Sequence, residues 1–276
     1  MPSKERVEQA NITRFMSLVS KRRGLKVSSY NELYNWSIEN IPDFWAEMWD
    51  FADIRASRGY DSVVDELTRF PGARWFVGSR LNFAENLLRH RDNRLAFIFK
   101  AENQRTTRMT YVELYHLVAR LADALRQLGI VPGDRIAAYM PNIVETAIAM
   151  LATTSIGAIW SSCGSELGPV AVLDRLSQIE PKVLFSVDGY PYKGKTFNFL
   201  PNAGRIAREL PSLEKVVVVP YVSENPDISC VPKSVSYTDF ISEGCGAEIE
   251  FEQVDFSHPV YIVFSSGTTG KPKCMV

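Results

Sequence analysis

Residues 135–160 read RIAAYMPNIVETAIAMLATTSIGAIW. The apolar run at 135–139 predicts a buried strand. Asn142 can then cap a helix that ends at Gly157, because an asparagine oxygen accepts a free backbone N–H and glycine adopts the left-handed turn at a helix end. Residues 158–160 begin a second strand. The order strand, helix, strand predicts two parallel neighbours in one sheet.

The same alternation continues on both sides of this unit. Upstream, a strand at 95–99 precedes a helix that Thr110 and Glu113 begin as a capping box and that Gly129 ends. We therefore predict an α/β fold, a mostly parallel sheet with helices on both faces. Its downstream elements are a helix near 170–179, a strand at 183–187, a helix near 203–210 and a strand at 216–219.

This architecture alone assigns no chemistry, because unrelated enzymes share it. A dinucleotide-binding protein would carry G-x-G-x-x-G after an early strand, and none of the expected strand-to-helix turns has that pattern. A serine hydrolase of this class would carry a G-x-S-x-G turn, which is also absent from the sequence. Both classes are therefore excluded.

A loop rich in hydroxyls, glycine and lysine follows the last apolar run, residues 260–264, which predicts a buried strand. The glycines can take positive φ and turn several N–H groups toward one anion, and short hydroxyl side chains donate without crowding. Lysines add the positive charge that a polyphosphate requires. The candidate phosphate-binding residues are Ser265, Ser266, Gly267, Thr268, Thr269, Gly270, Lys271 and Lys273.

The composition of this loop admits two other interpretations. A run of serine, glycine and threonine is often a flexible linker, but here a strand leads directly into it. An ordinary nucleotide P-loop needs four residues between its first glycine and a Gly-Lys-[Ser/Thr]. Only two residues separate Gly267 from Gly270, and Pro272 stands where the serine or threonine should be. The loop is therefore of a different kind.

The loop resembles the signature loop of the adenylate-forming enzymes, the superfamily of acyl-CoA synthetases, luciferases and peptide synthetases. Cys274 stands where most of that superfamily has glycine, and the run through Cys-Met-Val looks like the acetoacetyl-CoA synthetase family. Residues 157–162 (GAIWSS) and 174–179 (DRLSQI) also look like the acetoacetyl-CoA synthetase family. Acetyl-CoA synthetases have histidine at the place of Trp160. The resemblance implies that the loop binds ATP, and that Mg²⁺ and Lys273 assist the leaving phosphate.

A second match lies far from the first, at residues 75–90. Gly78 predicts a turn, and Leu81, Ala84 and Leu88 predict the apolar side of a following helix. The run Trp-Phe-x-Gly-x-x-Leu-Asn-x-x-x-Asn resembles the entry to the adenylation domain in acetyl- and acetoacetyl-CoA synthetases. We therefore expect an N-terminal helical extension and domain entry at 1–90, and an incomplete AMP-binding domain at 91–276.

A basic turn after the strand at 183–187 bears on a second substrate. It comprises Tyr192, Lys193, Gly194 and Lys195, and a glycine between lysines can present backbone and ammonium groups to a phosphate. A plain solvated turn is the alternative. In acetyl-CoA synthetases the matching segment contacts the nucleotide end of coenzyme A, so the resemblance implies a CoA contact here, with lysine and tyrosine in place of arginines.

The N-terminal fifth is rich in aromatic and acidic residues. This composition predicts short amphipathic helices packed on a larger body, and an exposed surface for a partner is the alternative. The aromatic residues are Tyr30, Tyr34, Trp36, Phe44, Trp45, Trp49 and Phe51.

Composition bounds the remaining possibilities. The 276 residues are 46% hydrophobic, enough for a sizeable core, and a formal net charge of −1 does not favour nucleic acid as a partner. The four cysteines show neither a metal-binding spacing nor a disulfide framework, and the N-terminus has no signal-peptide pattern. The apolar stretch 136–160 is interrupted by Pro141, Asn142 and Glu145, so we expect no membrane span and a cytosolic location.

The resemblance implies an acid–thiol ligase of ketone-body and lipid metabolism. Its substrates would be acetoacetate, ATP and coenzyme A, or, on a narrower alternative, acetate or propionate as the acid. The sequence ends at Val276, before the regions that hold the family's adenine contacts, acyl pocket and C-terminal domain. We therefore expect the chain alone to be inactive, with exposed sheet edges. A non-catalytic binding protein is the alternative of a different class, and the oligomeric state is left open.

Overall fold

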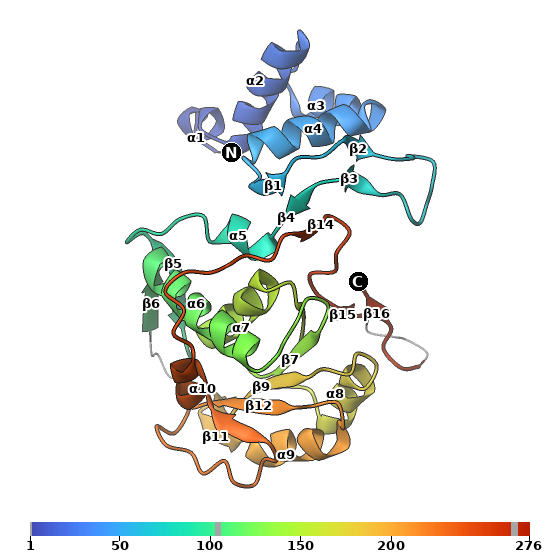
Figure 1. Ribbon diagram of the computed structural model, residues 1–276. Coiled ribbons are helices and arrows are strands. Elements are labelled where there is room, and N and C mark those ends of the chain that lie inside the picture. The colour runs from blue at the N-terminus through green and yellow to red at the C-terminus, as the bar shows by residue number, and fades with distance from the viewer. Residues whose placement is uncertain (1, 103–105, 266–269) are drawn as a thin grey trace. The chain divides into compact units, whose positions relative to one another are not determined.

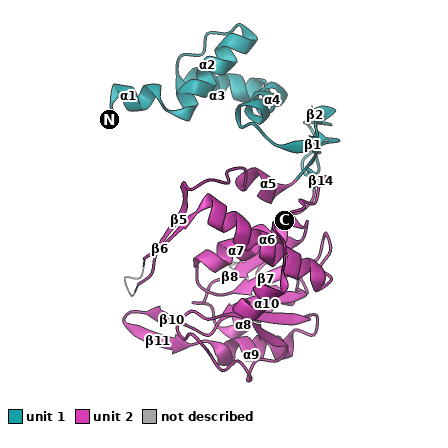
Figure 2. Cartoon of the chain, turned by 60° about the vertical axis from the view of Figure 1, so that its left-hand side comes forward, with its two compact units in different colours: residues 1–81, 255–257 teal, residues 82–254, 258–276 magenta. Residues whose placement is uncertain are grey.

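The computed structural model describes residues 2–102, 106–265 and 270–276. The chain divides into two compact units, shown in Figure 2. Unit 1 comprises residues 1–81 and 255–257, and unit 2 comprises residues 82–254 and 258–276. The short strand β14 (Val254–Asp255) lies where the chain passes from one unit to the other.

Unit 1 begins with four helices, as the aromatic and acidic pattern predicted. Phe15, Val19 and Leu33 are buried at their centre. Glu47 is also buried, and both Arg22 and Arg23 donate to its carboxylate, at 3.1 and 2.7 Å. The elements are α1 (Lys4–Glu8), α2 (Asn11–Arg23), α3 (Tyr30–Glu39), α4 (Ile41–Phe51), β1 (Ala56–Arg58), β2 (Ser62–Val64), β3 (Trp75–Val77) and β4 (Arg80–Leu81).

The aromatic residues of unit 1 divide between the two predicted roles. The Phe15 ring meets those of Phe44 and Phe51 edge-on, with centroids 5.7 and 5.1 Å apart, which is the expected packing. Tyr30 and Tyr34 instead remain 62% and 51% exposed and stack on each other. Packing is therefore confirmed among the helices of unit 1, and packing on a larger body stays a prediction.

Unit 2 is built on a parallel sheet of five strands in the order β13-β12-β9-β7-β8. The predicted strand–helix–strand unit supplies β7 and β8, which pair from Arg135 with Ile159 to Tyr139 with Cys163. This confirms the predicted α/β class and the parallel pairing. The strands are β7 (Arg135–Tyr139), β8 (Ile159–Cys163), β9 (Val183–Val187), β12 (Lys215–Val219) and β13 (Ser234–Ser236).

Helices cover both faces of this sheet, with α6 and α7 on one face and α8 and α9 on the other (Figure 1). The predicted capping box is present, because Thr110 accepts from the Glu113 N–H while the Glu113 carboxylate accepts from the Thr110 N–H. Gly129 has φ +89° just past the helix end, as expected. The helices are α5 (Phe83–Leu87), α6 (Tyr111–Gln127), α7 (Val144–Ser155), α8 (Pro169–Leu176), α9 (Leu200–Glu209) and α10 (Tyr237–Glu243).

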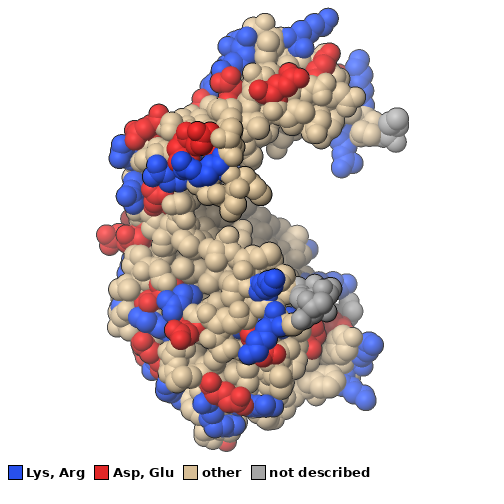
Figure 3. All heavy atoms as spheres, turned by 90° about the vertical axis from the view of Figure 1, so that its right-hand side faces the viewer, with Lys and Arg blue, Asp and Glu red and all other residues tan. Residues whose placement is uncertain are grey.

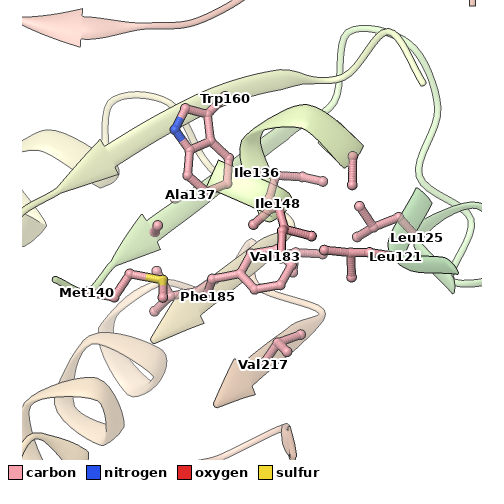
Figure 4. Close-up of a cluster of buried hydrophobic side chains, with 14 of the residues drawn as sticks. Leu121, Leu125, Ile136, Ala137, Met140, Ile148, Trp160, Val183, Phe185 and Val217 are labelled. Carbon is pink, nitrogen blue, oxygen red and sulfur yellow. The ribbon is translucent and has the colours of Figure 1, made fainter. Parts of the chain in front are cut away.

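The core of unit 2 comprises buried side chains of the sheet and of the helices α6, α7, α8 and α9, and Figure 4 shows part of it. Phe185 on β9 is fully buried, and its ring lies 6.3 Å from that of Trp160 on β8. Leu121 and Leu125 of α6 are also fully buried. Burying side chains of this size removes about 1.5–3 kcal/mol each of unfavourable hydration, so this core fixes the sheet on which the site is built.

Two predictions for the first half of unit 2 differ from the structure. The predicted strand at 95–99 is β5 (Leu95–Lys100), but it pairs antiparallel with β6 (Thr106–Thr110) in a sheet of its own. Asn142 does not cap α7, because Ile143 is the N-cap residue and makes no side-chain cap bond. A buried apolar N-cap serves here because α7 is held by packing rather than by its first turn.

Candidate substrate-binding site

The predicted phosphate loop lies at the end of a short antiparallel hairpin, β15 (Val263–Phe264) and β16 (Cys274–Met275). The Ser265 N–H donates to the Lys273 carbonyl at 3.0 Å, and the Lys273 N–H donates back to the Ser265 hydroxyl oxygen at 3.3 Å. These two bonds close the base of the loop and bring Ser265 beside Lys273. Of the predicted residues, Ser266, Gly267, Thr268 and Thr269 lie outside the described residues.

The base of this loop rests on helix α8 and the residues after it. Gln178 donates from Nε2 to the Pro272 carbonyl at 2.9 Å, and the Cys274 thiol donates to Gln178 Oε1 at 3.6 Å. Lys271 Nζ lies 3.9 Å from an Asp174 carboxylate oxygen while its side chain remains 76% exposed. Such an exposed pair is worth little, so Lys271 is available to an anionic ligand. Lys273 is likewise exposed.

The prediction that residues 260–264 form a buried strand is wrong about their burial. Val260 and Ile262 bond to the backbone of Trp160, at 3.0 and 2.8 Å, so this segment runs parallel to β8 at the sheet edge. Ile262 points into the core, but Tyr261 and Val263 are 45% and 49% exposed. An apolar run can satisfy a half-buried edge as well as a central strand, and periodicity alone does not separate the two.

The strand order places a switch point between β7 and β9. From β7 the chain crosses to β8 on one side, and from β8 it returns to β9 on the other. In open α/β sheets ligands bind at the carboxyl ends of the strands at such a point. A cavity of about 540 Å³ opens there. It is lined by Phe99, Lys100, Ala101, Glu102, Pro141, Asn142, Ile143, Ser165, Glu166, Tyr190, Pro191, Tyr192, Phe197 and Tyr221.

The predicted CoA segment forms the turn of a second hairpin, β10 (Gly189–Tyr192) and β11 (Lys195–Asn198). Lys193 and Gly194 have φ +49° and +73°, the two positive values that a tight hairpin turn of this kind requires. The Lys193 N–H donates to a Glu102 carboxylate oxygen at 2.7 Å. Gly194 and Lys195 line a neighbouring cavity of about 890 Å³, Tyr192 lines the cavity of about 540 Å³, and Lys193 lines neither.

Asp188, directly after β9, holds a loop whose residues line these two cavities. It is buried, and its carboxylate accepts the backbone N–H groups of Tyr221, Val222 and Ser223 at 2.7, 3.1 and 2.8 Å. Hydrogen bonds to a charged acceptor are about twice as strong as neutral ones, so this carboxylate fixes the loop after β12. Sequence reasoning missed Asp188, although an acid at the carboxyl end of a predicted strand was a usable signal.

Two buried groups at the carboxyl ends of β7 and β8 keep their protons. Burial raises the pKa of the Cys163 thiol to about 11 and that of the Tyr139 phenol to about 12. The Tyr139 hydroxyl donates to the Leu167 carbonyl. Both groups are therefore neutral near pH 7, and neither supplies an anion or a nucleophile to the site.

Charge around the site is mixed in sign. Figure 3 shows Lys and Arg interspersed with Asp and Glu on the displayed face. Among the residues that the structure describes, no group of three or more His, Cys, Asp or Glu side chains could hold a metal ion. Mg²⁺ in nucleotide sites is bound largely by substrate phosphates and water, so a site of that kind does not require such a group of protein ligands. In the described part of the chain, no helix has the length and apolarity to span a bilayer.

Comparison with known proteins identifies the family. The family model described as "AMP-binding enzyme" matches residues 83–276, and "Acetyl-coenzyme A synthetase N-terminus" matches residues 30–87. This chain belongs to the AMP-binding enzyme family. The family's match begins within the predicted domain-entry motif and includes the whole five-stranded sheet and the phosphate loop.

Several members of the AMP-binding family are similar to nearly the whole chain. Acetoacetyl-CoA synthetase of Gallus gallus is 47% identical over 96% of this chain and 41% of its own length. Acetoacetyl-coenzyme A synthetase of Rhizobium meliloti (strain 1021) is 41% identical over 100% of this chain and 42% of its own. A structure of acetoacetyl-CoA synthetase from Streptomyces lividans has a TM-score of 0.91 at 38% identity, over 99% of this chain and 42% of that one. The chain thus spans about two fifths of the length of these relatives.

Proposed function

We propose that this chain forms the front part of an AMP-forming ligase that converts acetoacetate, ATP and coenzyme A into acetoacetyl-CoA, AMP and pyrophosphate. The observation that carries the proposal is the lysine-bearing loop on a closed hairpin base, beside a parallel sheet of the AMP-binding family. Relatives named acetoacetyl-CoA synthetase, 47% and 41% identical over nearly the whole chain, support acetoacetate over acetate or propionate.

The reaction has two steps. A carboxylate oxygen of acetoacetate attacks the α-phosphorus of ATP, the bond from that phosphorus to the bridging oxygen of the β-phosphate breaks, and pyrophosphate leaves. Mg²⁺ held by the phosphates would neutralise part of the charge on the leaving group. The thiol sulfur of CoA then attacks the acyl carbon, AMP leaves, and the thiol proton passes to solvent. Catalysis of phosphoryl displacement rests mainly on positioning and on neutralising charge, which are the two things that a lysine-bearing loop supplies.

The loop residues receive distinct roles. Lys273 neutralises charge on the leaving pyrophosphate, and its backbone bonds with Ser265 hold it at the base of the loop. Lys271 adds a second, exposed positive charge. The β- and γ-phosphates would be bound by the hydroxyl and backbone N–H groups of Ser265, Ser266, Gly267, Thr268, Thr269 and Gly270.

The hairpin turn at the second cavity is assigned to CoA. Lys195 would meet phosphate groups of its nucleotide end, with Tyr192, Lys193 and Gly194 beside it. An ammonium group binds phosphate as a point charge, so lysine can serve where relatives use arginine, without the two parallel hydrogen bonds. We further propose residues 1–90 as an N-terminal extension, 91–276 as part of the AMP-binding domain, and a cytosolic location.

A reciprocal pair of variants tests both assignments. We expect Lys273→Ala to weaken the binding of Mg-ATP roughly tenfold or more, as loss of a charge-assisted contact of about 1.5–3 kcal/mol implies, and to leave CoA binding unchanged. Lys195→Ala should do the reverse. Titration calorimetry with each ligand measures both, and Lys26→Ala, an exposed lysine of unit 1, is the control. Equal losses for both ligands in either variant would contradict the division of roles.

The substrate is tested by exchange of labelled pyrophosphate into ATP. Acetoacetate should support exchange by the native protein purified from its source, and acetate or propionate should support much less. The purified 276-residue chain should support none. Sustained acetoacetate-dependent exchange by that chain would overturn the expectation that it is inactive alone, and equal rates with acetate would overturn the choice of acid.

A further inference from the structure

Asn82 belongs to the motif at 75–90, to which the proposed reaction gives no role. The residue is buried at 1% exposure and is the N-cap of α5. Its side-chain oxygen, Oδ1, accepts the Glu85 backbone N–H at 3.1 Å. An N-cap of this kind needs only an acceptor, and serine or aspartate would serve it as well. The amide nitrogen of Asn82 therefore has some other use.

That nitrogen lies within reach of three backbone carbonyl groups. The two hydrogens of Asn82 Nδ2 are shared among three carbonyl oxygens, those of Thr154 and Ser155, both at 3.0 Å, and that of Glu252 at 2.8 Å. Thr154 and Ser155 are in the last turn of α7, where carbonyl groups have no partner within the helix. One amide group thus ties the end of α7 to a segment about a hundred residues later.

The peptide at Glu252 is held from both sides. Its N–H donates to the Ser155 carbonyl at 2.9 Å, while its carbonyl accepts from Asn82. The segment also approaches the α7–β8 connection closely, because a Cβ at Gly157 would lie 2.9 Å from the Glu252 Cγ. Only a glycine, here at φ +73°, leaves room for this contact.

Residues 258–262, which follow 255–257, also contact the α7–β8 connection and β8. His258 Nε2 donates to the Gly157 carbonyl at 2.8 Å, and Ser161 Oγ donates to the Ile262 carbonyl at 2.9 Å. Val260 and Ile262 complete the contact through the backbone of Trp160. From Ile262 the chain enters β15 and then Ser265, the first residue of the phosphate loop.

We propose that Asn82 is a positioning residue for the phosphate loop. It fixes the end of α7 and the Glu252 peptide to each other, and so sets the place from which residues 258–265 extend along β8. The inference rests on the proposed function, in that the loop is taken to bind ATP. Asn82 touches no substrate in this account, and it acts only through the segment that leads to Ser265.

The substitution Asn82→Ser isolates the amide nitrogen, because serine can still cap α5 but donates only one hydrogen and reaches less far. We expect the Kd for Mg-ATP to rise roughly tenfold or more, since small displacements of a binding group are costly. Hydrogen exchange of the amides in 258–265 should become faster in the absence of any ligand. Asn82→Asp, which keeps the shape and the cap but places a second oxygen toward three carbonyl oxygens, is the second variant.

Leu210→Ala is the control for general loss of stability, because Leu210 is buried at the end of α9. It should lower the urea midpoint without selective exchange at 258–265. The inference fails if Asn82→Ser retains both the native Kd and the native exchange, or if Leu210→Ala changes them to the same extent. If the unsubstituted protein does not bind ATP, the proposed function fails, and the exchange of 258–265 alone still decides the role of Asn82.

Discussion

At the scale of single residues, aspartate side chains hold loops in both units. Each accepts several hydrogen bonds, from backbone N–H groups or from guanidinium groups. Asp188 does so in unit 2 by accepting three successive N–H groups. Asp65 does so in unit 1, where it accepts the Arg74 backbone N–H at 2.9 Å and the guanidinium groups of Arg74 and Arg69 at 3.0 and 2.9 Å.

Asp65 makes the stability of unit 1 depend on pH. The hydrogen bond from the Arg74 N–H, followed by that from the Arg74 side chain, lowers the pKa of Asp65 from 3.8 to about 2. Because the folded pKa is the lower one, the stabilisation is present above about pH 4 and is lost as the pH falls from about 4 toward 2. We expect Asp65→Asn to flatten the dependence of the urea midpoint on pH in that window.

Tryptophan fluorescence can follow this change, because Trp36, Trp45, Trp49 and Trp75 all lie in unit 1. Asp227→Asn is the control, since that carboxyl group has a lowered pKa but belongs to unit 2. A fluorescence midpoint that falls equally steeply with pH in Asp65→Asn and in the unsubstituted protein would contradict the role given to Asp65.

At the scale of elements, close backbone approaches set the helix packing. α10 ends at Gly244, and a Cβ there would lie 2.0 Å from the Arg120 carbonyl oxygen of α6. We expect Gly244→Ala to lower the free energy of unfolding by about 1–3 kcal/mol, because a backbone atom cannot move aside as a side chain can. Gly246→Ala, where the nearest atom is 2.9 Å away, should cost less.

Urea unfolding followed by circular dichroism measures this series. Gly59→Ala is the control without a neighbour, because nothing lies within 4 Å of its added Cβ. It should leave stability unchanged or raise it slightly by restricting the unfolded chain. If Gly244→Ala is no more destabilising than Gly59→Ala, the packing of α10 on α6 is looser than the structure describes.

Local sequence signals predicted the helices and strands of this chain well. They predicted the pairing between distant strands less well. The capping box at Thr110 and the apolar run at 183–187 each correspond to an element with the expected start, because their information lies within a few residues. Whether the strand at 95–99 joins the sheet or forms a hairpin depends on partners that periodicity does not name. For the same reason the half-exposed edge at 260–264 was predicted to be buried.

The candidate site divides in the same way. The lysines, glycines and hydroxyls of the loop are recognisable as phosphate-binding types from the sequence alone. The residues that hold the two loops in place were not recognisable from the sequence. Gln178 contacts Pro272 from 94 residues away, and Glu102 contacts Lys193 from 91 residues away. The assignments to ATP and CoA stay predictions until the ligand titrations are made.

At the scale of the whole molecule, the four cysteines report on how the chain is folded. Cys230, Cys245 and Cys274 are exposed and Cys163 is buried. Burial raises the pKa of Cys163 to about 11, and only the thiolate reacts with alkylating agents. With iodoacetamide near pH 8 we expect rapid labelling of the three exposed thiols, and labelling of Cys163 only after unfolding in urea.

Peptide mass spectrometry of the native and unfolded protein measures each site separately. The three exposed cysteines act as internal controls, since they show that the reagent is active in the same sample. Labelling of Cys163 in the native protein at the rate of Cys230 would mean that the carboxyl end of β8 is open to solvent, contrary to its 3% exposure.

The pairing of 260–262 with β8 has a consequence for synthesis on the ribosome. β8 ends at Cys163, and the segment that bonds to its outer edge is made about a hundred residues later. During that interval the Trp160 N–H and carbonyl have no strand beside them. An unpaired edge of a nascent sheet is a site for wrong pairing with other chains, so the emerging protein is most prone to aggregate before Ile262 leaves the exit tunnel.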